Sequence, residues 1–181
     1  SASQVEIQSG LQFYDGITTA EIQEILIRSA SDLISLDNPN YQYVAARLLL
    51  FSLRKSLYGR LEEIPHLWDH IHDCIDKGIY DEEILSKYAK NEIYKINSWI
   101  DHERDYLFTY AGLRQVCDKY LVQDRSTNEL YETPQYMYML IAATIFQKYP
   151  LETRLNYVRR YYDAISKHRI NIPTPIMAGV R

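Results

Sequence analysis

DNPNYQYVAARLLLFSLRKSLYG, residues 37–59, is the stretch that decides the fold. Asp37 and Asn38 are suited to cap a helix, Pro39 suits the first turn, and Gly59 supplies a stop at the other end. Between them, residues 41–57 contain neither glycine nor proline. Apolar side chains cover most of the circumference: Val44, Leu48, Leu49, Leu50, Phe51, Leu53 and Leu57. Because a helix that is apolar on so many sides is buried by several neighbours, we expect a mainly helical fold with this helix at its centre.

The segment before residue 37 predicts a helix that pairs with 41–57. Thr18 stands three residues before Glu21, the spacing of a capping box, and apolar residues follow at helical intervals to about Ser35. Because only a short polar link joins the two helices, we expect an antiparallel hairpin. Further helices are expected from Pro65 to Gly78, after Asp81, over 92–100, from Asp105 or Thr109 to about Lys119, from Thr133-Pro134, and from Pro150 to about Lys167.

Composition places the chain among globular proteins and excludes several classes. Its 181 residues are 46% hydrophobic and 24% charged, enough for one domain, or for one domain and a piece of another. A net charge of −4 provides no general attraction for nucleic acid. Cys74 and Cys117 are far apart, so reduced thiols are expected. No apolar run is long enough to cross a bilayer, and the Ser-Ala-Ser start does not look like a signal peptide. We therefore expect a cytoplasmic protein with no nucleic-acid or membrane partner.

Two segments depart from the helical pattern. Short β-favouring runs on either side of a polar turn at 124–128 predict a β-hairpin over about 120–132. The final segment, 170–181, alternates apolar residues with two prolines, and Pro175 favours extended geometry for Thr174. We expect a strand there, which would need strands beyond this chain to complete a sheet or barrel.

Several polar clusters contain the residue types found in reactive sites. His66, His70 and His72 share one predicted helix, and a four-residue spacing occurs in zinc sites. A zinc site needs further ligands, and the glutamate of metalloprotease helices is missing, so surface histidines are favoured and no metal is predicted. The charged run 101–105 is interpreted as helix caps and ion pairs. Neither a nucleophile elbow nor a glycine-rich phosphate loop is present, so no catalytic residue is predicted.

Two places in the sequence suit an anion. Thr19 opens one helix of the predicted hairpin and Lys55 ends the other, so a hydroxyl and an ammonium group would meet and could hold a phosphate. Helix capping and a dipole effect are the alternative, which the residues alone favour. Thr174 lies between two prolines and near a glycine, in a stiff segment that suits a phosphate-holding loop. A plain strand entry is the alternative there.

Seven motifs follow one another along nearly the whole chain. They are Phe13-Tyr14-Asp15-Gly16-Ile17, Asp37 with Tyr41-Gln42-Tyr43-Val44-Ala45-Ala46-Arg47, Leu53-Arg54-Lys55 with Tyr58-Gly59, Asp101-His102-Glu103-Arg104-Asp105, Lys119-Tyr120-Leu121-Val122, Tyr131-Glu132-Thr133-Pro134-Gln135, and Ile172-Pro173-Thr174-Pro175-Ile176-Met177-Ala178-Gly179-Val180-Arg181. In order and spacing they resemble the large subunit of class I ribonucleotide reductase, above all its enterobacterial and bacteriophage branch.

The resemblance implies three parts. Residues 1–59 are similar to the later, helical part of an ATP-cone, without its first strands. Residues 60–169 are similar to the helical N-terminal domain of that subunit, with the hairpin near 120–132. Residues 170–181 are similar to the first strand and the substrate-phosphate loop of a ten-stranded α/β barrel.

The resemblance also implies the chemistry of the complete enzyme. In this family a small subunit with a radical-generating metal cofactor acts on a homodimeric large subunit. A barrel cysteine carries the radical, and a cysteine pair reduces ribonucleoside diphosphates to deoxyribonucleoside diphosphates, with thioredoxin or glutaredoxin as reductant and ATP or dNTPs as effectors. Cys74 and Cys117 match no catalytic cysteine of the family. We therefore expect this chain to need the remainder of the large subunit and the small subunit for activity.

Three residues match binding residues of the family by their position in these motifs. Thr174 matches the threonine that holds the substrate diphosphate. Thr19 and Lys55 match residues that contact the regulatory nucleotide. Relatives regulated by dATP carry histidines where this chain has Gln23 and Ser52, a departure from the pattern associated with inhibition.

Two functions are compatible with these observations. The first is an N-terminal portion of a ribonucleoside-diphosphate reductase large subunit, active only when completed by the barrel and the small subunit. The alternative is a free-standing helical nucleotide-binding or interaction module without catalysis, which the absence of every catalytic cysteine would fit.

Overall fold

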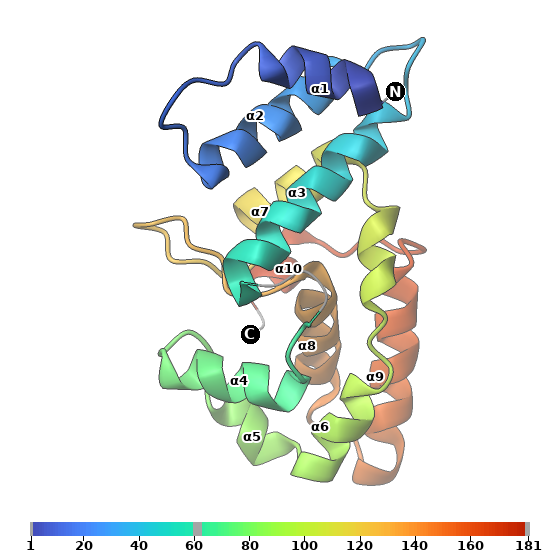
Figure 1. Cartoon of the computed structure of the whole chain (residues 1–181). Coiled ribbons are helices and arrows are strands. Elements are labelled where there is room, and N and C mark those ends of the chain that lie inside the picture. Colours follow the sequence, from blue (N-terminus) through green and yellow to red (C-terminus); the bar gives the residue numbers. More distant parts are fainter. Residues whose placement is uncertain (1, 60–62, 180–181) are drawn as a thin grey trace.

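The computed structural model describes residues 2–59 and 63–179, which are mainly helical and form no β-strand (Figure 1). The elements are α1 (Ala2–Gly10), α2 (Thr19–Asp32), α3 (Tyr41–Tyr58), α4 (Leu67–Asp76), α5 (Glu83–Lys87), α6 (Lys90–Asn97), the 3-10 helix η1 (His102–Leu107), α7 (Tyr110–Lys119), α8 (Pro134–Phe146), α9 (Leu151–Ser166) and α10 (Thr174–Gly179). Within these residues no helix is long and apolar enough to span a membrane. The predicted boundary between 59 and 60 borders residues 60–62, which lie outside the described chain.

The helical hairpin of α2 and α3 forms as predicted. The Thr18 hydroxyl accepts the Glu21 N–H at 3.2 Å, and the Glu21 carboxylate accepts the Thr18 N–H at 2.8 Å, which completes the capping box. Gly59 ends α3 in the left-handed region with φ 67°, where a residue with a Cβ would be strained. The predicted caps at Asp37 and Asn38 are wrong: α3 begins later, Asn40 is its N-cap, and no side chain caps it.

α3 is buried along one face rather than all round. Its buried residues are Tyr41, Ala45, Ala46, Leu49, Leu50, Leu53 and Arg54. Val44 and Phe51 lie on the other side, with 38% and 37% of their surface exposed. The apolar circumference of this helix therefore includes a stripe that the described residues leave open.

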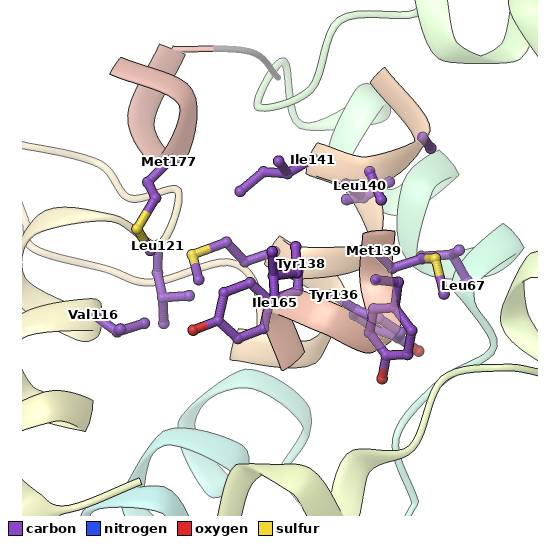
Figure 2. Close-up of a cluster of buried hydrophobic side chains, with 14 of the residues drawn as sticks. Leu67, Val116, Leu121, Tyr136, Tyr138, Met139, Leu140, Ile141, Ile165 and Met177 are labelled. Atoms are coloured by element: carbon purple, nitrogen blue, oxygen red, sulfur yellow. The ribbon is translucent and has the colours of Figure 1, made fainter. Parts of the chain in front are cut away.

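α8 is the most enclosed helix of the fold. Thr133 caps it and Pro134 occupies its first turn, as predicted, and every residue from Pro134 to Ala143 is buried. It packs against α9, η1 and α10. Figure 2 shows side chains of α8 in one cluster with Leu67 of α4, Val116 of α7 and Met177 of α10. Because PQYMYMLIAATIF has no charged side chain, any face of this helix can be buried without a desolvation cost for charge. The centre of the core is therefore α8, whereas α3 packs mainly against α2 and α7.

The predicted hairpin over 120–132 is not confirmed. Only one antiparallel bridge forms, between Gln123 and Leu130, flanked by the Tyr131 N–H to Val122 C=O bond of 3.0 Å. The Val122 N–H donates instead to the buried Glu132 carboxylate at 2.9 Å. That side-chain bond replaces the next backbone pair of a ladder, so the two arms separate after a single bridge.

The predicted strand over 170–181 is wrong for residues 174–179, which form the short helix α10. The Pro173 C=O accepts the N–H groups of Ile176 and Met177 at 3.0 and 3.2 Å. No strand among the described residues is available as a partner, so local bonds satisfy the backbone. Residues 180–181 of the predicted strand lie outside the described chain.

Candidate functional site

Thr19 and Lys55 lie toward the same end of the α2–α3 pair. Thr19 is the first residue of α2, and Lys55 lies in the last turn of α3; both are exposed. Between the helices, the Ser52 hydroxyl donates to Gln23 Oε1 at 3.4 Å. Thr19 precedes Gln23 by about one helical turn, and Lys55 follows Ser52 by about one turn. Both residues therefore lie beyond the Ser52–Gln23 contact, toward the end of the pair where α2 begins and α3 ends. The placement is compatible with a shared anion, and the site itself stays a prediction.

Charge near this end is not uniformly positive. The Glu21 carboxylate accepts the N–H and the hydroxyl of Thr18 and the hydroxyl of Tyr14, at 2.8, 2.7 and 3.0 Å. These hydrogen bonds, those of Thr18 first, lower the pKa of Glu21, so its negative charge is favoured beside the first turn of α2. An anion at Thr19 would therefore depend on Lys55 to offset that charge.

Thr174 is exposed at the beginning of α10. Its Oγ1 lies 3.2 Å from the phenolic oxygen of Tyr120, the residue that ends α7. Tyr120 also lines a hollow of about 440 Å³ between α7 and the segment 165–177. Thr174 is thus accessible to a ligand and held by one hydroxyl partner from a distant part of the chain.

A buried polar network joins four elements of the core. Asp105 on η1 accepts hydrogen bonds from Arg54 on α3 at 3.0 Å and from Gln135 on α8 at 2.9 Å. The Tyr162 hydroxyl on α9 donates to Gln135 at 2.8 Å and accepts the Asp101 N–H at 2.9 Å. Burial raises the pKa of Asp105 to about 6 despite these donors. The interpretation of 101–105 as caps and ion pairs is confirmed, since Asp101 also caps η1.

The histidines form no metal site. Among the described residues no group of three or more histidine, cysteine, aspartate or glutamate side chains is arranged to hold a metal ion. The prediction of surface histidines is wrong for His70, which is 3% exposed and lies 3.1 Å from the Tyr80 hydroxyl. Tyr80 donates in turn to the buried Glu132 at 2.6 Å. His66 instead caps α4 by accepting the Trp68 N–H.

Neither cysteine is arranged as a nucleophile. Cys74 and Cys117 are free and buried, and burial raises the pKa of each thiol to about 12. His70 lies 3.8 Å from the Cys74 sulfur, but burial lowers the pKa of that histidine to about 4. A neutral imidazole beside a neutral thiol provides no thiolate.

Comparison with known proteins places this helical structure. The family model described as "Ribonucleotide reductase, all-alpha domain" matches residues 106–181. This stretch is similar to the ribonucleotide reductase all-alpha domain. It contains α7 to α10, and therefore the enclosed helix α8 and the exposed Thr174.

The similarity to individual proteins extends beyond residues 106–181 to the whole chain. The chain is 52% identical over 181 residues to ribonucleoside-diphosphate reductase 1 subunit alpha of Escherichia coli, 51% identical to the alpha subunit of Haemophilus influenzae, and 47% identical over 183 residues to that of Enterobacteria phage T4. Each match covers 100% of this chain and 24% of the relative. The chain thus spans about a quarter of the length of these curated relatives.

One feature that lies mostly before residue 106 was not predicted from the sequence. A groove of about 870 Å³ runs between α3 and η1 beside the exposed stripe of Val44 and Phe51. The guanidinium groups of Arg47 and Arg54 lie over the Tyr106 ring, 5.7 and 5.6 Å from its centre. The groove depends on side chains brought together over about 60 residues of sequence, which no local motif reveals.

Proposed function

We propose that this chain is an N-terminal portion of the alpha subunit of a ribonucleoside-diphosphate reductase. The complete enzyme would convert ribonucleoside diphosphates to deoxyribonucleoside diphosphates by radical chemistry. The observation that carries the proposal is 52% identity to a ribonucleoside-diphosphate reductase alpha subunit over every residue of the chain. The alternative, a free-standing binding module, is not favoured, because the identity covers the whole chain rather than one isolated segment.

The chain would contribute the approach to the active site rather than the reacting groups. Both of its cysteines are buried and lack an activating partner, so the radical and reducing cysteines would come from the remainder of the subunit. Thr174 would hold the substrate diphosphate through its hydroxyl. Its exposure and its position on a short helix docked against the core support this role.

Regulation by nucleotides would involve the other end of the chain. Thr19 and Lys55 would contact an effector such as ATP, with Lys55 supplying the positive charge. Gln23 and Ser52 bond to each other at 3.4 Å in this region. Because neutral amide and hydroxyl groups replace histidines there, the complete subunit would not be inhibited by dATP through those positions.

The partners would be those of the complete enzyme. They comprise the remainder of the alpha subunit, a second alpha subunit and a radical-generating small subunit with its metal cofactor. Electrons would come from thioredoxin or glutaredoxin. The names of the relatives support a multi-subunit enzyme, because each is described as a subunit alpha.

A chimera tests the proposal. This chain replaces the aligned 181 residues of the Escherichia coli relative, and CDP reduction is measured with the partner subunit of that enzyme. We expect turnover within about tenfold of the parent, which corresponds to a change of about 1.4 kcal/mol in activation free energy. A matched chimera with Ile141→Asp should be inactive, since it buries an unpaired carboxylate in the core. A folded chimera that fails to reduce CDP would contradict the proposal.

A further inference from the structure

Two hydroxyl groups from distant segments meet beside α10. Tyr120 closes α7, and its N–H donates to the Val116 C=O at 2.9 Å, which fixes the backbone. Its phenolic oxygen lies 3.2 Å from Thr174 Oγ1, across 54 residues of sequence. Neither a helix cap nor a turn requires this contact, because Thr174 and Tyr120 belong to different elements.

The residue that follows Tyr120 holds the same face of α10 at a second point. Leu121 and Met177 are both buried, at 2% and 8% exposure, and Figure 2 shows the Met177 side chain directed at Leu121. Thr174 and Met177 are three residues apart, so they share one face of a helix. Consecutive residues at the end of α7 therefore hold α10 by one apolar contact and one polar contact. The buried Met177 side chain anchors α10 to the core. The Tyr120 hydroxyl is then placed to orient the Thr174 hydroxyl.

The chemistry of hydroxyl groups sets the direction of this hydrogen bond when an anion is present. Thr174 Oγ1 has one proton to donate and two lone pairs that accept. A phosphate oxygen only accepts, so Thr174 must give its proton to the phosphate. The Tyr120 hydroxyl must then be the donor to Thr174. Such a chain of donors polarises each member and strengthens the terminal bond to the charged group.

We infer that Tyr120 is a positioning residue for the substrate diphosphate, acting through Thr174 without touching the substrate. This inference rests on the proposed role of Thr174. It adds the specific requirement that the phenolic hydroxyl of Tyr120 orients the threonine proton toward the phosphate.

The test uses the complete alpha subunit with its partner subunit, and steady-state CDP reduction as the measurement. Tyr120→Phe keeps the ring that packs at the end of α7 and removes only the hydroxyl. We expect KM for CDP to rise roughly three- to tenfold, with kcat nearly unchanged. The variant loses the hydrogen bond from Tyr120 to Thr174, which strengthens the bond from Thr174 to the charged phosphate. Thr174→Val should raise KM at least as much. In the double variant, the loss of the Tyr120 hydroxyl should have no further effect, since its partner is already absent.

A matched control separates this role from a general loss of packing. Tyr131→Phe removes another phenolic hydroxyl near the same turn, one that bonds to Glu129 at 3.1 Å, and it should leave KM unchanged. If Thr174→Val raises KM but Tyr120→Phe behaves like Tyr131→Phe, the inference is overturned while the role of Thr174 stands. A Tyr120→Phe effect that persists undiminished in the Thr174→Val background also overturns it. If Thr174→Val leaves KM unchanged, both the inference and the proposed substrate contact fail.

Discussion

Arg54 on α3 and Asp105 on η1 form an ion pair in the interior, with 3.0 Å between Nη2 and Oδ2 and no exposed surface on the carboxylate side chain. The same Nη2 also donates to the His102 C=O at 2.7 Å. Through Gln135, the second oxygen of Asp105 is linked to α8. This pair therefore joins the N-terminal hairpin to the helices that surround the core.

Removing one member of this pair should destabilise the chain strongly. Arg54→Ala leaves Asp105 buried without its cation, which typically costs about 3–5 kcal/mol. The free energy of unfolding, measured with urea, should fall by that amount. The matched control is Lys77→Ala, which breaks the exposed Lys77–Asp73 pair of 2.7 Å and should change stability by less than about 1 kcal/mol. Equal losses of unfolding free energy in the two variants would show that the buried pair stabilises the fold no more than the exposed pair.

The contrast between local and distant contacts explains what could be predicted. The capping box at Thr18 and the cap at Thr133 depend on residues three positions apart, and both were predicted correctly. The burial of Asp105 depends on Arg54, which is 51 residues away in the sequence. The burial of His70 likewise depends on the tertiary fold, which places the Tyr80 hydroxyl beside it. No local pattern contains that information.

The errors at the two predicted β segments have a similar cause. For Thr174, the preference for extended geometry before a proline is a weak local rule. With no neighbouring strand among the described residues, hydrogen bonds to Pro173 outweigh it and a helical turn forms. At Val122, a buried carboxylate from Glu132 takes the N–H that a hairpin would use. The exposure of Thr174 followed no sequence rule. Thr174 became a candidate phosphate site from its place between two prolines, and the resemblance of the final motif specified a substrate diphosphate.

Acid should weaken the fold through His70. Burial lowers the pKa of His70 from 6.5 to about 4 in the folded chain. The stabilisation from keeping it neutral is therefore complete above pH 6.5 and is lost as pH falls toward 4. A difference of this size corresponds to about 3 kcal/mol at most. Urea unfolding between pH 7 and pH 4 should show the loss.

A non-titrating variant isolates the contribution of this histidine. His70→Gln can still bond to the Tyr80 hydroxyl but binds no proton, so its stability should fall less steeply with acid. His102, whose pKa burial also lowers to about 4, remains in the variant and preserves part of the slope. His72→Gln, on the same helix, serves as the control. An unchanged slope in His70→Gln would show that the pKa of His70 is not lowered in the fold.

Core substitutions should identify α8, rather than the outer stripe of α3, as the centre of the fold. Ile141 is fully buried, so Ile141→Ala should cost about 2–5 kcal/mol through lost contacts and a residual cavity. Val44 is 38% exposed, and Val44→Ala should cost less than about 1 kcal/mol. Thermal and urea unfolding of both variants provides the comparison. A larger effect at Val44 would indicate that a partner covers the outer stripe in solution.

The proposed nucleotide site predicts a specific role for the charge of Lys55. Lys55→Ala in the complete alpha subunit should weaken ATP binding at this end of the chain about tenfold, because a charge-assisted bond to phosphate is lost beside the negative Glu21. Isothermal titration calorimetry measures the change directly. Lys148→Ala, an exposed lysine after the end of α8, is the control for a change of net charge alone. Glu21→Gln should act in the opposite direction and tighten binding, since it removes the carboxylate that competes with the phosphate for the positive end of α2. If Lys55→Ala and Lys148→Ala bind ATP equally well, Lys55 does not contact the nucleotide.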